Sequence, residues 1–234
     1  MENMFNIKVD TSLKTEVLGT VYGSCTIPSN MFNKDSICYC VGAGEDISFD
    51  CELTKIYNSE VFIFDPTPRA KSHFEQLEKS VKNQTKMPID SSKTLFYEIN
   101  KEQLSRLKFL EYGIWKETKK VQFYAPQKKE YVSHSIVNLQ KKHSTFEAQC
   151  YTVKDLMEKL NHKKIDLLKL DVEGAEYDVI DNLISSKLDI HILYIEFHEI
   201  ENFIEKTKKS VKDLSQLGYK VIDIKKRDIL FIKE

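Results

Sequence analysis

Short apolar runs alternate with amphipathic helical segments along most of this 234-residue chain. The four clearest runs are ICYCV (37–41), VFIFD (61–65), IDLLKLD (165–171) and HILYIEF (191–197). Strands that alternate with helices form right-handed βαβ units around a mainly parallel sheet. We therefore expect an α/β fold, whose ligands lie outside the carboxyl ends of the strands.

The other elements follow from periodicity and turn residues. We expect helices over 47–57, 66–83, 152–160, 174–184 and 200–217. A shorter strand is expected over 108–115, ending at Gly113. The runs YKVIDI and ILFIK near the end of the chain predict a closing antiparallel hairpin, which makes the sheet mixed.

No internal repeat or low-complexity linker interrupts the chain, so we expect a single domain over 1–234. Residues 1–35 are a leader of uncertain structure, and residues 121–152 are an excursion from the sheet on the substrate side. Loops of this kind often carry substrate contacts. The candidates are Ser133, His134, Ser135 and Asn138. A solvated surface loop is the alternative for this segment.

The composition limits the partners. The chain has 35 basic and 36 acidic residues, so no overall field favours nucleic acid or an anionic membrane. No run of about 18 apolar residues is present to span a bilayer. The five cysteines are an odd number in a chain too large to need disulfides, which favours reduced thiols and a cytoplasmic location.

A glycine loop follows the first strand. Its residues are Gly42, Ala43 and Gly44. Such a loop lets the backbone approach a ligand, but Ile47 stands where a dinucleotide fingerprint has its third glycine. Glu45 and Asp46 come next and would repel a pyrophosphate. The loop therefore favours a nucleoside ligand that is cationic and lacks phosphate.

S-adenosylmethionine meets that description, since it carries a sulfonium, an ammonium and one carboxylate. We expect the loop amides to take the carboxylate, while Glu45 and Asp46 balance the cationic groups. The alternative is that both acids only cap a helix. Asp65 ends the second strand, where an acid accepts the hydroxyls of a ribose. An NAD site would use the same acid, and an N-cap before Pro66 is compatible with either ligand.

Acids and a histidine follow two further strands. Asp171 and Glu173 come after the fourth strand, and Glu196 and His198 end the fifth. Because their spacing places each pair on one side of an extended chain, we expect the four groups to converge. They can supply a general base or bind a hard divalent cation. Capping of the next helix is the alternative for Glu173. The later acids Glu176 and Asp178 are expected on a helix, facing solvent.

Four stretches in this order resemble the FkbM family of S-adenosylmethionine-dependent methyltransferases. They are VGAGEDISFD, FDPTPR, LLKLDVEGAEYDVI and LYIEFH, within residues 36 to 199. The resemblance implies a class I methyltransferase fold, which is Rossmann-like and three-layered. Its seven-stranded sheet is mainly parallel and ends in an antiparallel hairpin. The family also implies O-methylation, often of sugars in glycans, glycolipids or secondary metabolites.

The resemblance also implies roles for single residues. Gly42 and Gly44 would line the methionine end of the cofactor, and Asp171 and Glu173 would lie beside the reacting methyl. Gly113 and Asp171 are further candidates for cofactor contact. The D-x-E pair is similar in placement to the D-x-D of macrocin-type sugar O-methyltransferases, whose first acid helps bind magnesium and whose second is the base. A metal on Asp171 and Glu196 is thus a candidate, but EF replaces the paired aspartates after the next strand, which argues against it.

These observations lead to one mechanistic hypothesis. A hydroxyl oxygen of a small molecule or glycan, in the first place a sugar, attacks the sulfonium methyl in line. Glu173, or as second choice His198, takes the hydroxyl proton. Two alternatives remain open at this point: an NAD-dependent oxidoreductase and a non-catalytic domain that binds an adenosyl ligand.

Overall fold

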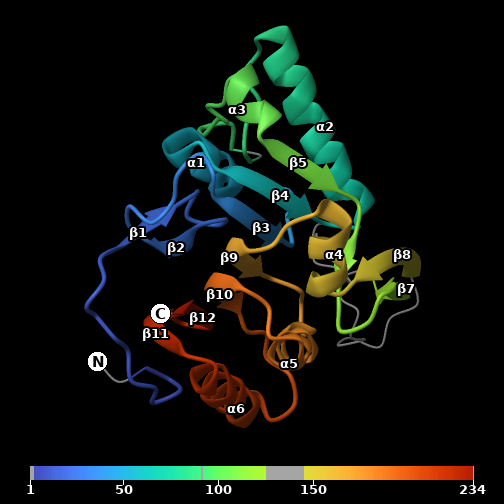
Figure 1. Cartoon of the computed structure of the whole chain (residues 1–234). Helices are drawn as coiled ribbons and strands as arrows, with labels where there is room; N and C mark the ends of the chain where they lie inside the picture. The colour runs from blue at the N-terminus through green and yellow to red at the C-terminus, as the bar shows by residue number, and fades with distance from the viewer. Residues whose placement is uncertain (1–2, 91, 125–144, 234) are drawn as a thin grey trace.

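A seven-stranded sheet forms the centre of the protein, as a computed structural model shows for residues 3–90, 92–124 and 145–233 (Figure 1). Its strand order is β11-β12-β10-β9-β3-β4-β5. The strands are β3 (Ile37–Val41), β4 (Glu60–Phe64), β5 (Leu107–Leu110), β9 (Ile165–Leu170), β10 (Ile190–Glu196), β11 (Tyr219–Lys225) and β12 (Asp228–Lys233). Strand β12 runs antiparallel to the other six strands, which confirms the mixed sheet and its closing hairpin.

Helices cover both faces of this sheet (Figure 1). They are α1 (Ser48–Tyr57), α2 (Pro68–Asn83), α3 (Lys101–Ser105), α4 (Val153–Leu160), α5 (Glu176–Ser186) and α6 (Phe203–Gln216). Strand alternation divides the core: Cys38 and Cys40 of β3 face the α1 and α2 layer, whereas Tyr39 and Val41 face the α4 to α6 layer. None of the described helices is long and apolar enough to cross a bilayer.

The leader contains a hairpin that the sequence pattern did not predict. Strands β1 (Thr15–Leu18) and β2 (Cys25–Pro28) pair antiparallel and lie beside α1 and β10. The loop between them is tied to the start of α1, because Thr20 N donates to Ser48 Oγ at 2.9 Å. This loop therefore reaches the carboxyl end of the central sheet, where the glycine loop lies.

A small second sheet follows β5. Its strands, in the order β6-β8-β7, are β6 (Gly113–Ile114), β7 (Lys119–Tyr124) and β8 (Thr145–Tyr151). The prediction of one strand over 108–115 is wrong, because β5 ends at Leu110 and Gly113 pairs with Cys150 of β8 instead. A Cβ atom at Gly113 would stand 2.6 Å from the Cys150 sulfur, so a larger residue there would displace this side chain.

The helix starts also refine the predictions. Thr67, and not Asp65, is the N-cap of α2, since its hydroxyl accepts from Ala70 N and Pro68 takes the first helical position. Thr152 caps α4 as expected, accepting from Asp155 N at 3.1 Å. Both caps are local, so the sequence carries their signal.

Candidate functional site

One cavity of about 720 Å³ opens at the carboxyl ends of β3, β4, β9 and β10. The predicted residues that line it are Gly42, Ala43, Gly44, Glu45, Asp46, Asp65, Gly113, Asp171, Glu173, Glu196 and His198. The β1–β2 loop and the turn between β11 and β12 complete its wall. Tertiary structure thus brings together every described residue that the sequence nominated. The substrate candidates Ser133, His134, Ser135 and Asn138 lie outside the described residues.

Gly42 fits the loop closely against β9. Its φ is +82°, and a Cβ atom there would stand 2.2 Å from the carbonyl oxygen of Asp171. Gly42 O also accepts a hydrogen bond of 2.9 Å from Lys169 Nζ. A residue with a Cβ atom would be strained at this positive φ and would overlap the Asp171 carbonyl oxygen. Glycine is therefore required where the loop leaves β3.

The carboxylate of Asp65 is used within the protein. Its Oδ2 accepts from Ala43 N and Gly44 N, each at 3.0 Å, and its Oδ1 accepts from the backbone and hydroxyl of Thr67. These two loop amides are therefore engaged within the protein, and binding of the cofactor carboxylate by the loop stays a prediction. The ribose role of Asp65 stays a prediction, and it requires Asp65 to share or release some of these bonds.

The two acids of the glycine loop also have protein partners. Arg69 of α2 holds Glu45 through its Nε and Nη2 atoms, at 3.0 and 2.5 Å. Asp46 accepts from the Thr20 hydroxyl at 2.5 Å and from Ser48 N at 2.9 Å. These bonds fasten the loop to α2 and to the β1–β2 hairpin. Contact of either acid with a cofactor stays a prediction.

The buried Glu176 side chain is hydrogen-bonded to His198. The prediction that Glu176 faces solvent is wrong, because its side chain is 0% exposed. Its Oε1 accepts from Val172 N at 3.2 Å and lies 2.8 Å from His198 Nδ1. The backbone turns through positive φ at Glu173 and Gly174, which points the first side chain of α5 back under the turn. The one local signal was a glycine two residues before an acid at a helix start.

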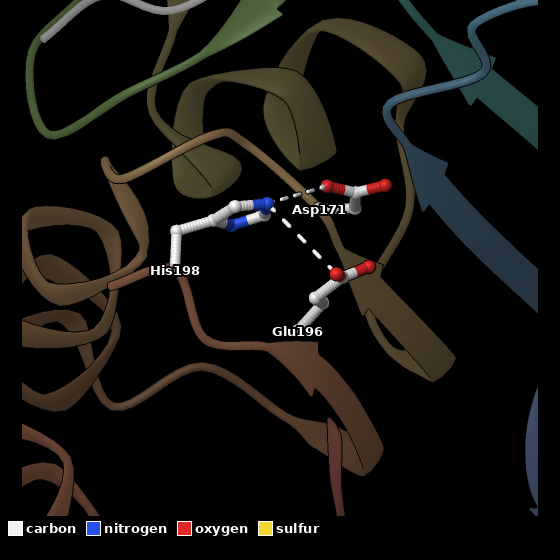
Figure 2. A group of neighbouring side chains, drawn as sticks. All are labelled: Asp171, Glu196 and His198. Atoms are coloured by element: carbon white, nitrogen blue, oxygen red, sulfur yellow. Dashed lines mark ion pairs between the residues drawn. The ribbon is translucent and has the colours of Figure 1, made fainter. Parts of the chain in front are cut away.

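Three further carboxylates surround the other ring nitrogen of His198, and Figure 2 shows two of them, those of Asp171 and Glu196. Its Nε2 lies 3.4 Å from Glu173, 3.8 Å from Asp171 and 3.9 Å from Glu196. Burial lowers the pKa of His198, but the bond to Glu176 and the charges of Glu176, Glu173 and Asp171 together raise it to about 9. His198 is therefore protonated at neutral pH and offers a cation among the acids.

Burial has the opposite consequence for Asp171. It raises the pKa of this carboxyl to about 7, with Glu196 and Glu173 adding to the rise and Lys169 and His198 opposing it. A carboxyl so perturbed, in a cleft beside other acids, is typical of functional sites.

Comparison with known proteins identifies the chain at this point. The sequence matches the methyltransferase FkbM domain over residues 40–221, which is more than half of its length. The chain belongs to the FkbM methyltransferase family. It is an S-adenosylmethionine-dependent methyltransferase with a class I fold. The family argues against the NAD-dependent oxidoreductase. No curated protein matches the chain.

Three solved structures are similar to this FkbM protein. A fibrillarin pre-rRNA processing protein of Methanococcus jannaschii is 12% identical, with a TM-score of 0.41, and 86% of this chain covers 66% of that one. Aeropyrum pernix fibrillarin with bound S-adenosyl-L-methionine is 11% identical, with a TM-score of 0.46. The match covers 88% of this chain and 68% of the fibrillarin chain. Precorrin-6y C5,15-methyltransferase of Geobacter metallireducens is 11% identical, with a TM-score of 0.42. The match covers 87% of this chain and 82% of that chain.

The FkbM site also holds a donor set for a divalent cation. Ligand atoms of Asp171, Glu196 and His198 lie within 4.8 Å of one another (Figure 2). Glu176 holds the far nitrogen of the ring, an arrangement that orients a metal-binding histidine. Two carboxylates and an imidazole fit Mn²⁺ or Fe²⁺ better than Mg²⁺, which prefers oxygen donors. Such an ion would polarise an acceptor hydroxyl at this wall.

Proposed function

We propose that this FkbM methyltransferase transfers a methyl group from S-adenosylmethionine to a hydroxyl of a small molecule or glycan, in the first place a sugar. The observation that carries the proposal is the placement of Glu173, Asp171 and His198 on one wall of the cavity that the glycine loop borders. A wall of carboxylates offers hydrogen-bond acceptors to hydroxyl groups.

The cavity mouth supports a sugar as the acceptor. Val21 and Tyr22, at the tip of the β1–β2 loop, both line the cavity, and the Tyr22 side chain is 83% exposed. The carboxylates of Asp171 and Glu173 line the same cavity. An exposed ring beside hydrogen-bond acceptors suits a ligand with apolar faces and hydroxyl edges.

In the proposed reaction, a lone pair of the hydroxyl oxygen attacks the methyl carbon while the carbon–sulfur bond breaks. The bonding electrons remain on sulfur, which gives S-adenosylhomocysteine, and the hydroxyl proton passes to Glu173. His198 is the second choice, because the neighbouring acids raise its pKa and favour the imidazolium. Alignment of the two reactants supplies most of the acceleration, on the order of several kcal/mol.

The acceptor is found by supplying the enzyme with methyl-¹³C cofactor and a panel of free sugars, nucleotide sugars and glycolipid headgroups. S-adenosylhomocysteine release identifies the acceptor, and the ¹³C shift of the transferred methyl distinguishes oxygen from nitrogen or carbon. A methylated nitrogen or carbon would overturn the proposal. Turnover that persists in EDTA would show that Asp171, Glu196 and His198 act without a metal.

Glu173→Gln tests the base. We expect kcat to fall roughly a hundredfold or more, with S-adenosylhomocysteine affinity within about twofold of wild type. Asp178→Asn, which changes a nearby acid on α5 that pairs with Lys116, is the matched control and keeps its turnover. Near-full turnover of Glu173→Gln would exclude Glu173 as the base.

We also propose a cellular location for the protein. All five cysteines are free and buried. Burial raises the pKa of the Cys25 thiol to about 12, so it is unreactive as a nucleophile. We propose a cytoplasmic location on this ground, and a fusion to a fluorescent protein would test it.

A further inference from the structure

Helix α1 begins directly after the glycine loop without a polar N-cap of its own. Its N-cap is Ile47, a buried residue whose side chain makes no capping hydrogen bond. The Ile47 N–H group instead donates to the hydroxyl oxygen of Tyr97 at 3.1 Å, across 50 positions of the sequence. A buried backbone donor requires a partner, because leaving it unpaired costs free energy. The junction between the glycine loop and α1 therefore depends on Tyr97.

Tyr97 is itself held by two neighbours. It lies in the segment between α2 and α3, where its backbone N donates to Met87 O at 3.0 Å. Its buried ring packs edge-on against that of His73, with 5.6 Å between the ring centroids. His73 Nε2 lies 2.8 Å from the Tyr97 hydroxyl oxygen. Since His73 belongs to α2, these contacts join α2 to the start of α1.

The direction of the two hydrogen bonds follows from the groups that make them. The Ile47 N–H group can only donate, so the Tyr97 oxygen accepts from it. Burial raises the pKa of Tyr97, so the hydroxyl keeps its own proton. Among the described residues, His73 Nε2 is the acceptor that lies within hydrogen-bond distance of this hydroxyl. His73 is then neutral and carries its ring proton on Nδ1.

Protonation of His73 would reverse one of these bonds. An imidazolium has no acceptor nitrogen, so Nε2 would donate to the Tyr97 oxygen and the hydroxyl proton would lose its acceptor. Hydrogen bonds in a chain strengthen one another, so the bond from Ile47 N would weaken at the same time. The arrangement is therefore specific to neutral His73.

The surroundings set the pH at which this change occurs. Burial lowers the pKa of His73 below its ordinary value, and the charges of two acids in the glycine loop oppose this. His73 is thus neutral at pH 7 to 8 and gains its proton in the acid range. The charged and titratable groups beside the pair are Glu45 and Asp46 of the glycine loop, Asp50 and Cys51 of α1, and Arg69, which pairs with Glu45 from α2.

We propose that His73 and Tyr97 are positioning residues of the cofactor site, which hold the glycine loop at the start of α1 while His73 is neutral and release it when His73 is protonated. Glu45 and Asp46 directly precede Ile47 and line the cofactor cavity, so a shift of the Ile47 backbone moves the wall of that cavity. Neither His73 nor Tyr97 is among the described lining residues, so both act through the loop. The inference concerns cofactor binding and is independent of the acceptor proposed above.

Calorimetric titration with S-adenosylhomocysteine at about pH 8 and about pH 5, above and below the ordinary pKa of histidine, tests the proposal. Tyr97→Phe removes both hydrogen bonds and should bind the ligand about three- to tenfold more weakly than wild type at the higher pH. His73→Gln keeps an acceptor that does not titrate, so it should bind like wild type at the higher pH. On acidification it should lose about three- to tenfold less affinity than wild type.

Other titrations in this pH range are common to both proteins. The carboxyls of Asp50 and Asp171, with pKa values raised to about 6 and about 7, also line the cavity. They are unchanged in His73→Gln, so the difference between this variant and wild type isolates His73. His162→Asn is the matched control, because His162 Nδ1 also lies against a tyrosine hydroxyl, that of Tyr39 at 2.7 Å. His162 is not among the described lining residues, so this variant should keep the wild-type affinities.

An equal loss of affinity on acidification in wild type and His73→Gln would overturn the proposal. So would wild-type affinity of Tyr97→Phe at the higher pH, because Ile47 N would then need no partner. The amide resonance of Ile47 gives a second measurement without ligand: it should move with the titration of His73 in wild type and stay in place in His73→Gln. If Tyr97→Phe does not fold, these comparisons of wild type with His73→Gln still decide. The titrations need no acceptor, so their failure is distinct from failure of the sugar proposal.

Discussion

At the scale of single residues, the site depends on positions where the backbone leaves ordinary conformations. Gly42 and Gly218 both have positive φ, of +82° and +93°. A Cβ atom at Gly42 would meet Asp171 O at 2.2 Å, whereas at Gly218 its nearest neighbour would be Lys233 Cγ at 3.9 Å. A side chain at Gly218 would thus cause backbone strain alone, whereas a side chain at Gly42 would cause both strain and steric overlap.

This pair makes the first prediction. Gly218→Ala should lower the free energy of unfolding by about 1–2 kcal/mol, the cost of strain alone. Gly42→Ala should cost more and should abolish S-adenosylhomocysteine binding, because the loop must move off β9. Chemical denaturation and calorimetry measure both effects. Equal costs with intact binding in both variants would contradict this account.

Glu176 carries the second prediction at this scale. Its charge and hydrogen bond are the main causes that hold the pKa of His198 at about 9. Glu176→Gln should therefore lower the pKa of His198 by about one unit or more, since a neutral amide stabilises the imidazolium less. An NMR titration of the ring nitrogens measures it. Asp178→Asn is the control, and an unchanged pKa in Glu176→Gln would show that the other acids suffice.

At the scale of elements, the β1–β2 hairpin forms a wall of the site and is hydrogen-bonded to the glycine loop. The Thr20 hydroxyl donates to Asp46 and accepts from Gly23 N at 3.0 Å. Glu52 of α1 adds a bond of 2.6 Å from Gly19 N. These bonds join a segment of the leader to the first core loop, so hairpin order and cofactor affinity should be linked.

Thr20→Val tests this link. The variant keeps the shape of the side chain and removes both hydrogen bonds, which are worth about 1–2 kcal/mol together. Amide exchange in residues 19–24 should become faster, and S-adenosylhomocysteine should bind several times more weakly. Thr15→Val, at an exposed position of β1, is the control. Faster exchange without weaker binding would show that the hairpin is independent of the cofactor site.

At the scale of the whole molecule, the buried charges make stability depend on pH. The pKa of His198 is raised to about 9 in the folded protein, so its stabilising effect is complete below its ordinary value and is lost as pH rises through 9. Asp171, with its pKa raised to about 7, disfavours folding once it ionises, and stability is lost as pH rises from about 4 to about 7. The two effects have the same sign.

The free energy of unfolding should therefore fall between pH 6.5 and pH 9, by up to about 3 kcal/mol from His198. Denaturant titrations across this range measure the slope. His198→Gln should flatten it, because the substituted side chain does not titrate. A wild-type slope of zero would contradict the raised pKa of His198, and a slope that survives in His198→Gln would assign the pH dependence to other groups.

The sequence by itself determined the order of elements and the edge of the sheet where ligands bind. Alternating apolar runs specify buried strands, and the strand-end rule selected Asp171, Glu173, Glu196 and His198, because these signals are local. Tertiary structure alone decided which partners the charges have. Arg69 holds Glu45, Asp65 takes the loop amides, and Glu176 turns inward through the positive φ at Gly174. These pairings join residues from different elements, so local sequence patterns do not specify the partners.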